Sequence, residues 1–321
     1  MKNLSTKLLA LFTVVSAATS VRTAHAEGAA TQPVHVGFVG EGGRARVDGV
    51  SVGLPAARLD ELRGLQLAAG AGVLRDLAGV QVAGGVTVAT GDATGVQLAP
   101  VTYAARLRGV QVGAVNVADE LEGFQLAPVN IARRGAGFRL GVVNVLGEHE
   151  GEALGVLTFA RGGVHDVSVY TSDTMLGNVA LKLGTRHLYT GFHFSHHPGN
   201  EAEGGSGRFE RDTRRFGMGV ALGWRFPVAV GPLAHVDLEL SGTSVRAAAF
   251  GAEAGMLAAA RLQAAVELAP HLKLIVGAGM NTSFATSGGA LDIGTGFLEQ
   301  RLGKGDPAVR LFPGLTLGLS T

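Results

Sequence analysis

Short apolar runs recur through the first half of the chain at nearly constant spacing. Each run begins with a glycine, as in Gly109-Val-Gln-Val-Gly-Ala-Val-Asn-Val-Ala118. Self-similarity at a fixed short period is typical of a repeat architecture, in which each unit packs on its neighbours. The pattern therefore predicts eight tandem units. Their leading glycines are Gly49, Gly64, Gly79, Gly95, Gly109, Gly123, Gly137 and Gly151, at spacings of 15, 15, 16, 14, 14, 14 and 14 residues.

The alternation within one unit changes phase at its centre. Val110 and Val112 share one strand face, but the step from Val112 to Val115 is three residues and breaks the two-residue period. We therefore expect the valines to face inward on two short strands that meet at a corner, Gly113-Ala114. The predicted fold is a β-solenoid whose coils each have two strands, a corner and a polar return loop. An antiparallel meander with one strand per unit is the alternative. A tight bend needs small residues, and the position four after each leading glycine is always small: Gly53, Ala68, Ala83, Ala99, Gly113, Ala127, Gly141 and Gly155.

Amide side chains recur at two fixed positions of the unit. In a parallel stack these residues would form columns, because equivalent positions of successive coils lie about 4.8 Å apart. Amides in such columns can bond to the coils above and below. Structural amide ladders are the favoured interpretation, and a polar stripe that reads a ligand is the alternative. The residues are Gln66, Gln81, Gln97, Gln111 and Gln125 at the third position, and Asn116, Asn130 and Asn144 at the eighth.

The unit G-Φ-Q-Φ-[GA]-x-V-N-[VI]-A, best developed over residues 95–160, resembles the surface repeat of bacterial surface proteins first named from leptospiral genomes. The repeats cover about a third of the chain, and the first three depart from the pattern because they lack the asparagine. The resemblance implies export and surface placement. It brings no defined catalytic activity.

Longer strands of strict alternation replace the repeat from about Val164. Between residues 216 and 226, Phe, Met, Val, Leu and Trp occupy the even positions, and Gly, Ala and Arg the odd ones. Large apolar residues that alternate with small or charged ones over about ten residues are typical of transmembrane β-barrel strands. Roughly eight such strands between His165 and Leu319 predict a small antiparallel β-barrel of the outer-membrane type. A β-sandwich is the competing fold, because one-sided apolar strands also pack against a second sheet.

Charged residues fall on the face of these strands that would line the barrel. In so narrow a barrel, side chains fill the interior, so we expect them to form an ion-pair network rather than a conducting path. Short links at residues 227–232 and 269–271 are predicted at one end, and the polar loop 197–214 at the other. The inward charged residues are Arg225, Asp237, Glu239, Arg261, Glu267 and Lys273.

The first 26 residues have the pattern of a signal peptide. Lys2 and Lys7 precede an apolar stretch, residues 8–21, and Ala24-His25-Ala26 fits the cleavage pattern. The predicted organisation is therefore a signal peptide (1–26), an N-terminal linker or cap (27–48), the tandem-repeat β region (49–163) and the barrel or sandwich (164–321). We expect an exported protein of the outer membrane or cell surface, with a periplasmic or secreted protein as the alternative.

Composition and motifs give no support to catalysis. The chain has no cysteine, and its 27 Lys and Arg balance 26 Asp and Glu, so neither thiolate chemistry nor a nucleic-acid partner is indicated. Gly49-Val-Ser-Val-Gly53 matches a nucleophile elbow, but Ser51 is in repeat register and no helix follows.

The histidines give no metal site either. His193, His196 and His197 precede the polar loop, yet His193 and His196 lie on opposite faces of a strand. We therefore expect no catalytic, cofactor or metal residue. The predicted function is that of a non-enzymatic cell-envelope surface protein with a structural or interaction role. A narrow outer-membrane channel is the alternative.

Overall fold

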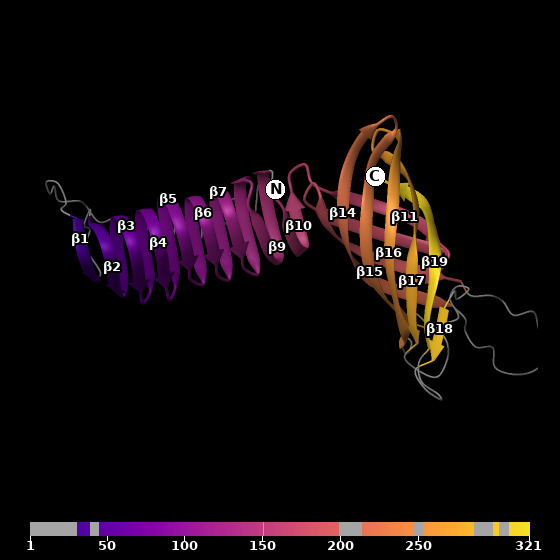
Figure 1. Cartoon of the computed structure of the whole chain (residues 1–321), viewed down its shortest axis with the longest axis horizontal. Coiled ribbons are helices and arrows are strands. Elements are labelled where there is room, and N and C mark those ends of the chain that lie inside the picture. Colours follow the sequence, from indigo (N-terminus) through magenta and orange to yellow (C-terminus); the bar gives the residue numbers. More distant parts are fainter. Residues whose placement is uncertain are drawn as a thin grey trace, which may run out of the picture. The chain divides into compact units, whose positions relative to one another are not determined.

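The computed structural model of the chain describes residues 31–38, 45–149, 151–198, 214–246, 253–285, 298–301 and 308–321. The regular elements among these residues are all β-strands (Figure 1). In the described part of the chain, no helix has the length and apolar character needed to cross a bilayer. Contacts divide the chain into two units, Met1–Phe138 and Arg139–Thr321. The predicted signal peptide and nearly all of the predicted polar loop 197–214 lie outside the described residues.

The first unit is a parallel β-solenoid. Leading glycines pair with leading glycines, so that Gly95 lies beside Gly109 and Gly109 beside Gly123. This arrangement confirms the predicted solenoid, and the antiparallel meander is wrong. The stack begins before the first recognised repeat, because β1 lies within the predicted linker. Each strand pairs in parallel with the next, in the order β1 (Thr31–Phe38), β2 (Arg46–Leu54), β3 (Ala56–Ala68), β4 (Ala71–Ala83), β5 (Val86–Leu98), β6 (Val101–Val112), β7 (Val115–Leu126) and β8 (Val129–Gly135).

Each coil has three corners, and at one of them the buried positions step by three residues, from Ala118 to Leu121. Glycine or small residues mark the remaining two. One corner is the predicted one, which separates β6 from β7 at Gly113 and Ala114. The other is the leading glycine, which lies inside a strand: Gly109 has φ +148°, and a Cβ there would overlap the carbonyl oxygen of Gly95. Only glycine adopts this backbone without strain. The predicted return loop is therefore wrong, because the strand continues through that part of the coil.

The interior of the solenoid holds the amides, and the valines face outward. Gln111 and Asn116 are fully buried, whereas Val110 and Val115 are partly exposed. The expectation that the valines face inward is wrong. The register explains the reversal, because amides stacked in columns satisfy one another and need no water. Small and aliphatic columns complete the core, which includes Leu59, Leu62, Leu74, Leu77, Ala104, Leu107, Ala118 and Leu121.

The amide ladders are confirmed by the side-chain hydrogen bonds. Gln111 Nε2 donates to Gln97 Oε1 at 2.9 Å, and Gln125 Nε2 donates to Gln111 Oε1 at 2.7 Å. Gln81 and Gln97 continue this column in the same way, each over 2.8 Å. In the second column, Asn116 accepts from Thr102 and donates to Asn130. Because these residues are buried, a stripe that reads an external ligand is excluded at these positions.

The second unit contains strands of two further coils and an antiparallel barrel. Strands β9 (Phe138–His149) and β10 (Ala153–Ala160) pair in parallel as in the solenoid. Eight strands follow, each antiparallel to the next, and the pairing of the first with the last closes the barrel. The predicted eight-stranded barrel is confirmed, and the sandwich is wrong. The strands are β11 (His165–Ser172), β12 (Gly177–Gly184), β13 (Leu188–His197), β14 (Arg215–Val230), β15 (Leu233–Arg246), β16 (Glu253–Ala269), β17 (Leu272–Ala285) and β19 (Ala308–Ser320); β18 (Leu298–Arg301) also pairs with β19.

The two ends of the barrel differ. Tight links at residues 185–187, 231–232 and 270–271 join strand pairs at one end, and the last two fall within the predicted short links. The chain enters the barrel at this same end, where Val164 N donates to Gly184 O at 3.1 Å. Strand β10 also contacts β12 and β13 there, and Thr190 Oγ1 donates to Gly155 O at 2.6 Å. Strand β10 therefore joins the barrel at its short-link end.

Candidate functional site in the barrel lumen

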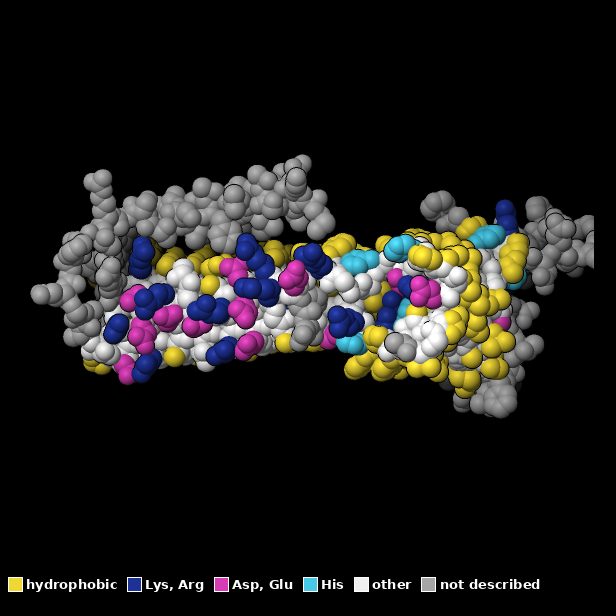
Figure 2. Space-filling view, turned by 90° about the horizontal axis from the view of Figure 1, so that it is seen from above, with side chains coloured by type: hydrophobic (Ala, Val, Ile, Leu, Met, Phe, Trp, Pro, Cys, Tyr) yellow, Lys and Arg dark blue, Asp and Glu magenta, His cyan; other side chains and the backbone are white. Residues whose placement is uncertain are grey.

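Alternate residues of the barrel strands face outward, and most of these are large and apolar. Trp224 is 54% exposed and Leu240 is 55% exposed, although both are strongly hydrophobic. Figure 2 shows apolar side chains spread over the barrel surface. The residues between them, such as Gly223 and Glu239, point into the lumen and are buried. This alternation places the chemistry of the barrel in its interior.

A lysine lies at the centre of the lumen. Lys182 Nζ lies 3.3 Å from Asp237 Oδ2 and 3.1 Å from Glu239 Oε2. It also donates to the Tyr189 hydroxyl and to Gln263 Oε1, each at 3.1 Å. All of these residues are almost fully buried. A buried cation is tolerated only where it is paired and hydrogen-bonded, and this one meets both conditions.

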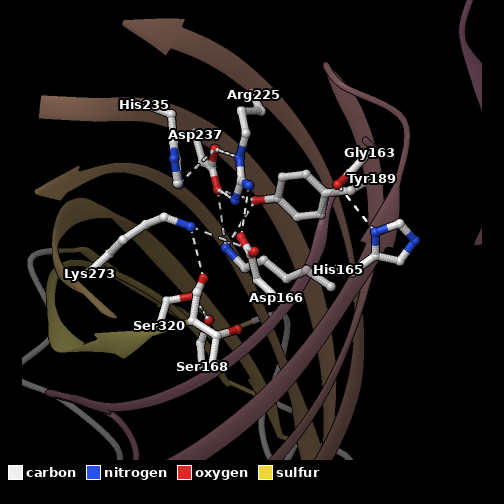
Figure 3. Close-up of polar contacts among 12 residues, drawn as sticks. Gly163, His165, Asp166, Ser168, Tyr189, Arg225, His235, Asp237, Lys273 and Ser320 are labelled. Carbon is white, nitrogen blue, oxygen red and sulfur yellow. Dashed lines mark hydrogen bonds and ion pairs between the residues drawn. The ribbon is translucent and has the colours of Figure 1, made fainter. Parts of the chain in front are cut away.

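An arginine extends the cluster towards the first barrel strand (Figure 3). Arg225 donates from Nε and Nη2 to the two oxygens of Asp237, at 2.8 and 2.9 Å. Its Nη1 lies 2.7 Å from Asp166 Oδ2, and Lys273 Nζ lies 3.8 Å from the other oxygen of Asp166. His235 Nε2 is 3.8 Å from Asp237. Strands β11, β14, β15 and β17 are thus tied together through one connected set of charges.

Little free volume remains in the lumen. A cavity of about 10 Å³, enough for about one water molecule, is lined by Lys182, Glu239, His193 and neighbouring residues. A second, apolar cluster also fills the interior: Met175, Val245, Leu257 and Phe312. In the described part of the barrel, side chains therefore occupy the interior, as the predicted network requires.

The inward charged residues were predicted in part. Arg225, Asp237, Glu239 and Arg261 are buried in the lumen, and Lys273 lies at its edge. The prediction for Glu267 is wrong: it is exposed near the end of β16, where the register with β17 shifts.

Three members of the cluster, Lys182, Asp166 and Tyr189, were not predicted from the sequence. The inward direction of Lys182 could have been predicted from alternation. Asn178, Ala180 and Lys182 occupy alternate positions of β12, and the positions between them are the outward Val179 and Leu181.

The singled-out histidines and Ser51 lie apart from one another. His193 faces the lumen and is 2.7 Å from Thr243 Oγ1, whereas His196 faces outward and packs on the Phe216 ring. His197 ends β13. Ser51 is buried in the glutamine column of the solenoid. Among the described residues, no three His, Asp or Glu side chains are grouped so as to hold a metal ion.

Comparisons with known proteins add little to this geometry. No family model and no curated protein matches the sequence. The crystal structure of Neisserial surface protein A is similar to part of the chain, at 12% identity and a TM-score of 0.26. The match covers 49% of this chain and 92% of that one. At this TM-score the likeness says nothing about function.

Proposed function

We propose that this chain is an exported, non-enzymatic protein that its barrel holds in the outer membrane, where it has a structural or interaction role. The observation that carries the proposal is the apolar belt around the barrel. Eight tilted strands and a band about 25 Å high give a belt on the order of 1,200 Å². Soluble monomers rarely expose apolar patches above about 600 Å². A lipid environment accounts for such a belt, because the closed barrel leaves no unpaired edge on its wall.

The filled lumen supports an anchor rather than a channel. A conducting path needs continuous water, whereas Lys182, Arg225, Asp237 and Glu239 are linked across the interior. The network is structural in this proposal, because it joins strands from opposite parts of the wall. A reaction site would also need room for a substrate, and the lumen cavity of about 10 Å³ offers none.

Barrel sidedness supports a periplasmic position for the repeats. Outer-membrane barrels have short turns on the periplasmic side and longer loops outside. The chain enters β11 at the short-link end, beside residues 185–187. The solenoid, which precedes β11, would then hang on the periplasmic side. This differs from the surface placement that the repeat resemblance implies.

Fractionation of the native envelope tests the proposal. We expect the protein in the outer membrane, with faster gel migration before heating than after. Protease added to intact cells should leave the repeats uncut and cut them once the outer membrane is permeabilised. A planar bilayer should show no stable conductance. A soluble protein with unchanged mobility refutes the anchor, steady conductance refutes the sealed lumen, and cleavage of the repeats in intact cells refutes the periplasmic position.

A further inference from the structure

The outside of the solenoid is apolar on two of its three sides. On the first side, two rows of outward residues run through the stack, and no residue in either row is charged. Leu98 and Leu126 of this side are 44% and 40% exposed. The rows are Val50, Leu65, Val80, Val96, Val110 and Phe124, with Val52, Leu67, Val82, Leu98, Val112 and Leu126.

The second side, which follows the corner at Gly113 and Ala114, is also apolar. Its outward residues are aliphatic or aromatic from β4 onward, and all of them are half-buried except Val88, which is buried. They form the rows Ala71, Val86, Val101, Val115 and Val129, and Val73, Val88, Tyr103, Val117 and Ile131.

The third side carries the charges, and they are mostly paired. Arg108 Nε lies 2.9 Å from Glu122 Oε2 in the next coil, and Arg106 pairs with Asp92. Figure 2 shows acidic and basic side chains intermixed along this part of the chain. In cross-section the solenoid is therefore amphipathic, as an interfacial helix is, but on a β-sheet frame.

We propose that the two apolar sides of the solenoid dock on the lipid surface of the membrane that holds the barrel. This inference rests on the proposed anchoring of the barrel. Because the solenoid is covalently linked to the barrel, its effective concentration at the bilayer is high. Even a weak affinity for lipid would then suffice for docking. The backbone also permits it, because each coil bonds to its neighbours along the stack and the sides leave few polar groups to desolvate.

A second copy of the chain fits these surfaces less well. Two rows along six coils cover on the order of 300 Å² of one side, from strand spacings of about 4.8 Å and a strip about 10 Å wide. A stable dimer buries about 800 Å² per partner. A second copy would also cover only one of the two apolar sides, whereas lipid molecules can contact both.

The unit that contains the barrel also exposes apolar residues on its coils. In the last two coils, Val142 and Val156 are about half exposed, and so are Val167 and Val169 at the start of the barrel wall. Strand β10 contacts β12 and β13 within this unit. Apolar surface therefore extends from the lipid-facing belt of the barrel onto the first coil beside it.

Single-cysteine labelling of the full chain tests the inference, because the natural sequence has no cysteine. We would attach a nitrobenzoxadiazole dye to Leu126→Cys on the apolar side, or to Glu122→Cys on the charged side of the same strand. Each labelled protein is reconstituted in phosphatidylcholine–phosphatidylglycerol vesicles with and without acyl-chain spin-labelled lipid. Trp224, the single tryptophan, reports barrel insertion in the same sample.

We expect spin-labelled lipid to quench the dye at position 126 about as strongly as Trp224, and to leave the dye at position 122 bright. Leu98→Cys should repeat the result for 126, and unchanged circular dichroism checks the fold of each variant. Quenched Trp224 with a bright dye at 126 overturns lipid docking but leaves the barrel anchor standing. Unquenched Trp224 overturns the anchor itself. Disulfide-linked dimers through Leu126→Cys, without lipid quenching, identify a second copy as the occupant and overturn the inference.

Discussion

Breaking the glutamine ladder at its centre should lower the free energy of unfolding far more than removing the glutamine at its end. Gln111 makes three side-chain hydrogen bonds, with Gln97, Gln125 and the Val117 carbonyl. In Gln111→Leu, the Gln97 acceptor and the Gln125 donor both lose their partner in a fully buried column. Each orphaned buried group costs about 1–3 kcal/mol, so the expected loss of unfolding free energy is about 2–6 kcal/mol.

Gln66→Leu is the matched control, because it is the same substitution at the first glutamine of the column. Gln66 Oε1 accepts from Gln81 Nε2, which also donates to the Gly72 carbonyl at 2.9 Å. The Gln66 Nε2 atom has no hydrogen-bond partner among the described residues. Removing Gln66 therefore orphans no donor, and we expect a cost below about 1 kcal/mol.

Hydrogen exchange measured by mass spectrometry on the full chain in detergent separates these outcomes. Peptides from β5 to β7 should lose at least about 30-fold in protection in Gln111→Leu, since 1.4 kcal/mol is a factor of ten. In Gln66→Leu the loss over β3 and β4 should be several-fold at most. Equal losses in the two variants would refute the ladder argument, because both remove the same side chain and add the same leucine.

Three further perturbations test other parts of the structure. Gly109→Ala should destabilise the solenoid by more than about 1 kcal/mol in a denaturant titration, because the φ of Gly109 is +148° and an added Cβ would overlap the preceding coil. Gly242→Ala is the control and should be nearly neutral, because its Cβ would meet nothing within 4 Å. Burial and the hydrogen bond to Asp119 raise the pKa of Tyr103 to about 12. The stabilisation that this contact provides is therefore complete below pH 10 and is lost as the pH rises through 12. The difference in phenolate absorbance between wild type and Tyr103→Phe should titrate near pH 12, and a midpoint near pH 10 contradicts the contact. Lys182→Met removes the cation that Asp237 and Glu239 share on the inner face of β15, so we expect the free energy of unfolding to fall by about 3 kcal/mol. The heat-dependent gel shift should then occur at a lower temperature, and an unchanged shift contradicts the network.

The sequence predicted the course of the backbone better than the direction of the side chains. The three-residue step from Val112 to Val115 and the small residues after each glycine placed the corner correctly. The same alternation was compatible with either face inward. The hydrophobic rule chose the valines, and the structure has Gln111 and Asn116 inside. Hydrogen bonding across a 14-residue period decides the matter, and it becomes visible only when the coils are stacked in register.

The lumen cluster was predictable where alternation was long and regular. Asp237 and Glu239 follow strict parity in β15, and both point inward. Glu267 failed because the register between β16 and β17 shifts near the turn, and parity no longer fixes direction there. Asp166 and Lys182 are neighbours on the adjacent strands β11 and β12, but Asp166 pairs with Arg225 of β14. Lys182 likewise pairs with Asp237 of β15, so only barrel closure brings these partners into the same cluster.

The register of the columns has a consequence for length. Within the 14-residue units, glycine lies on glycine, glutamine on glutamine and leucine on leucine, as Gly109 lies on Gly123 and Leu107 on Leu121. Removing residues 109–122 would present Gln97 to Gln125 as Gln111 does now. Whole coils are thus interchangeable. The solenoid can be lengthened or shortened in steps of about 4.8 Å, one coil at a time, with the same residues in its core.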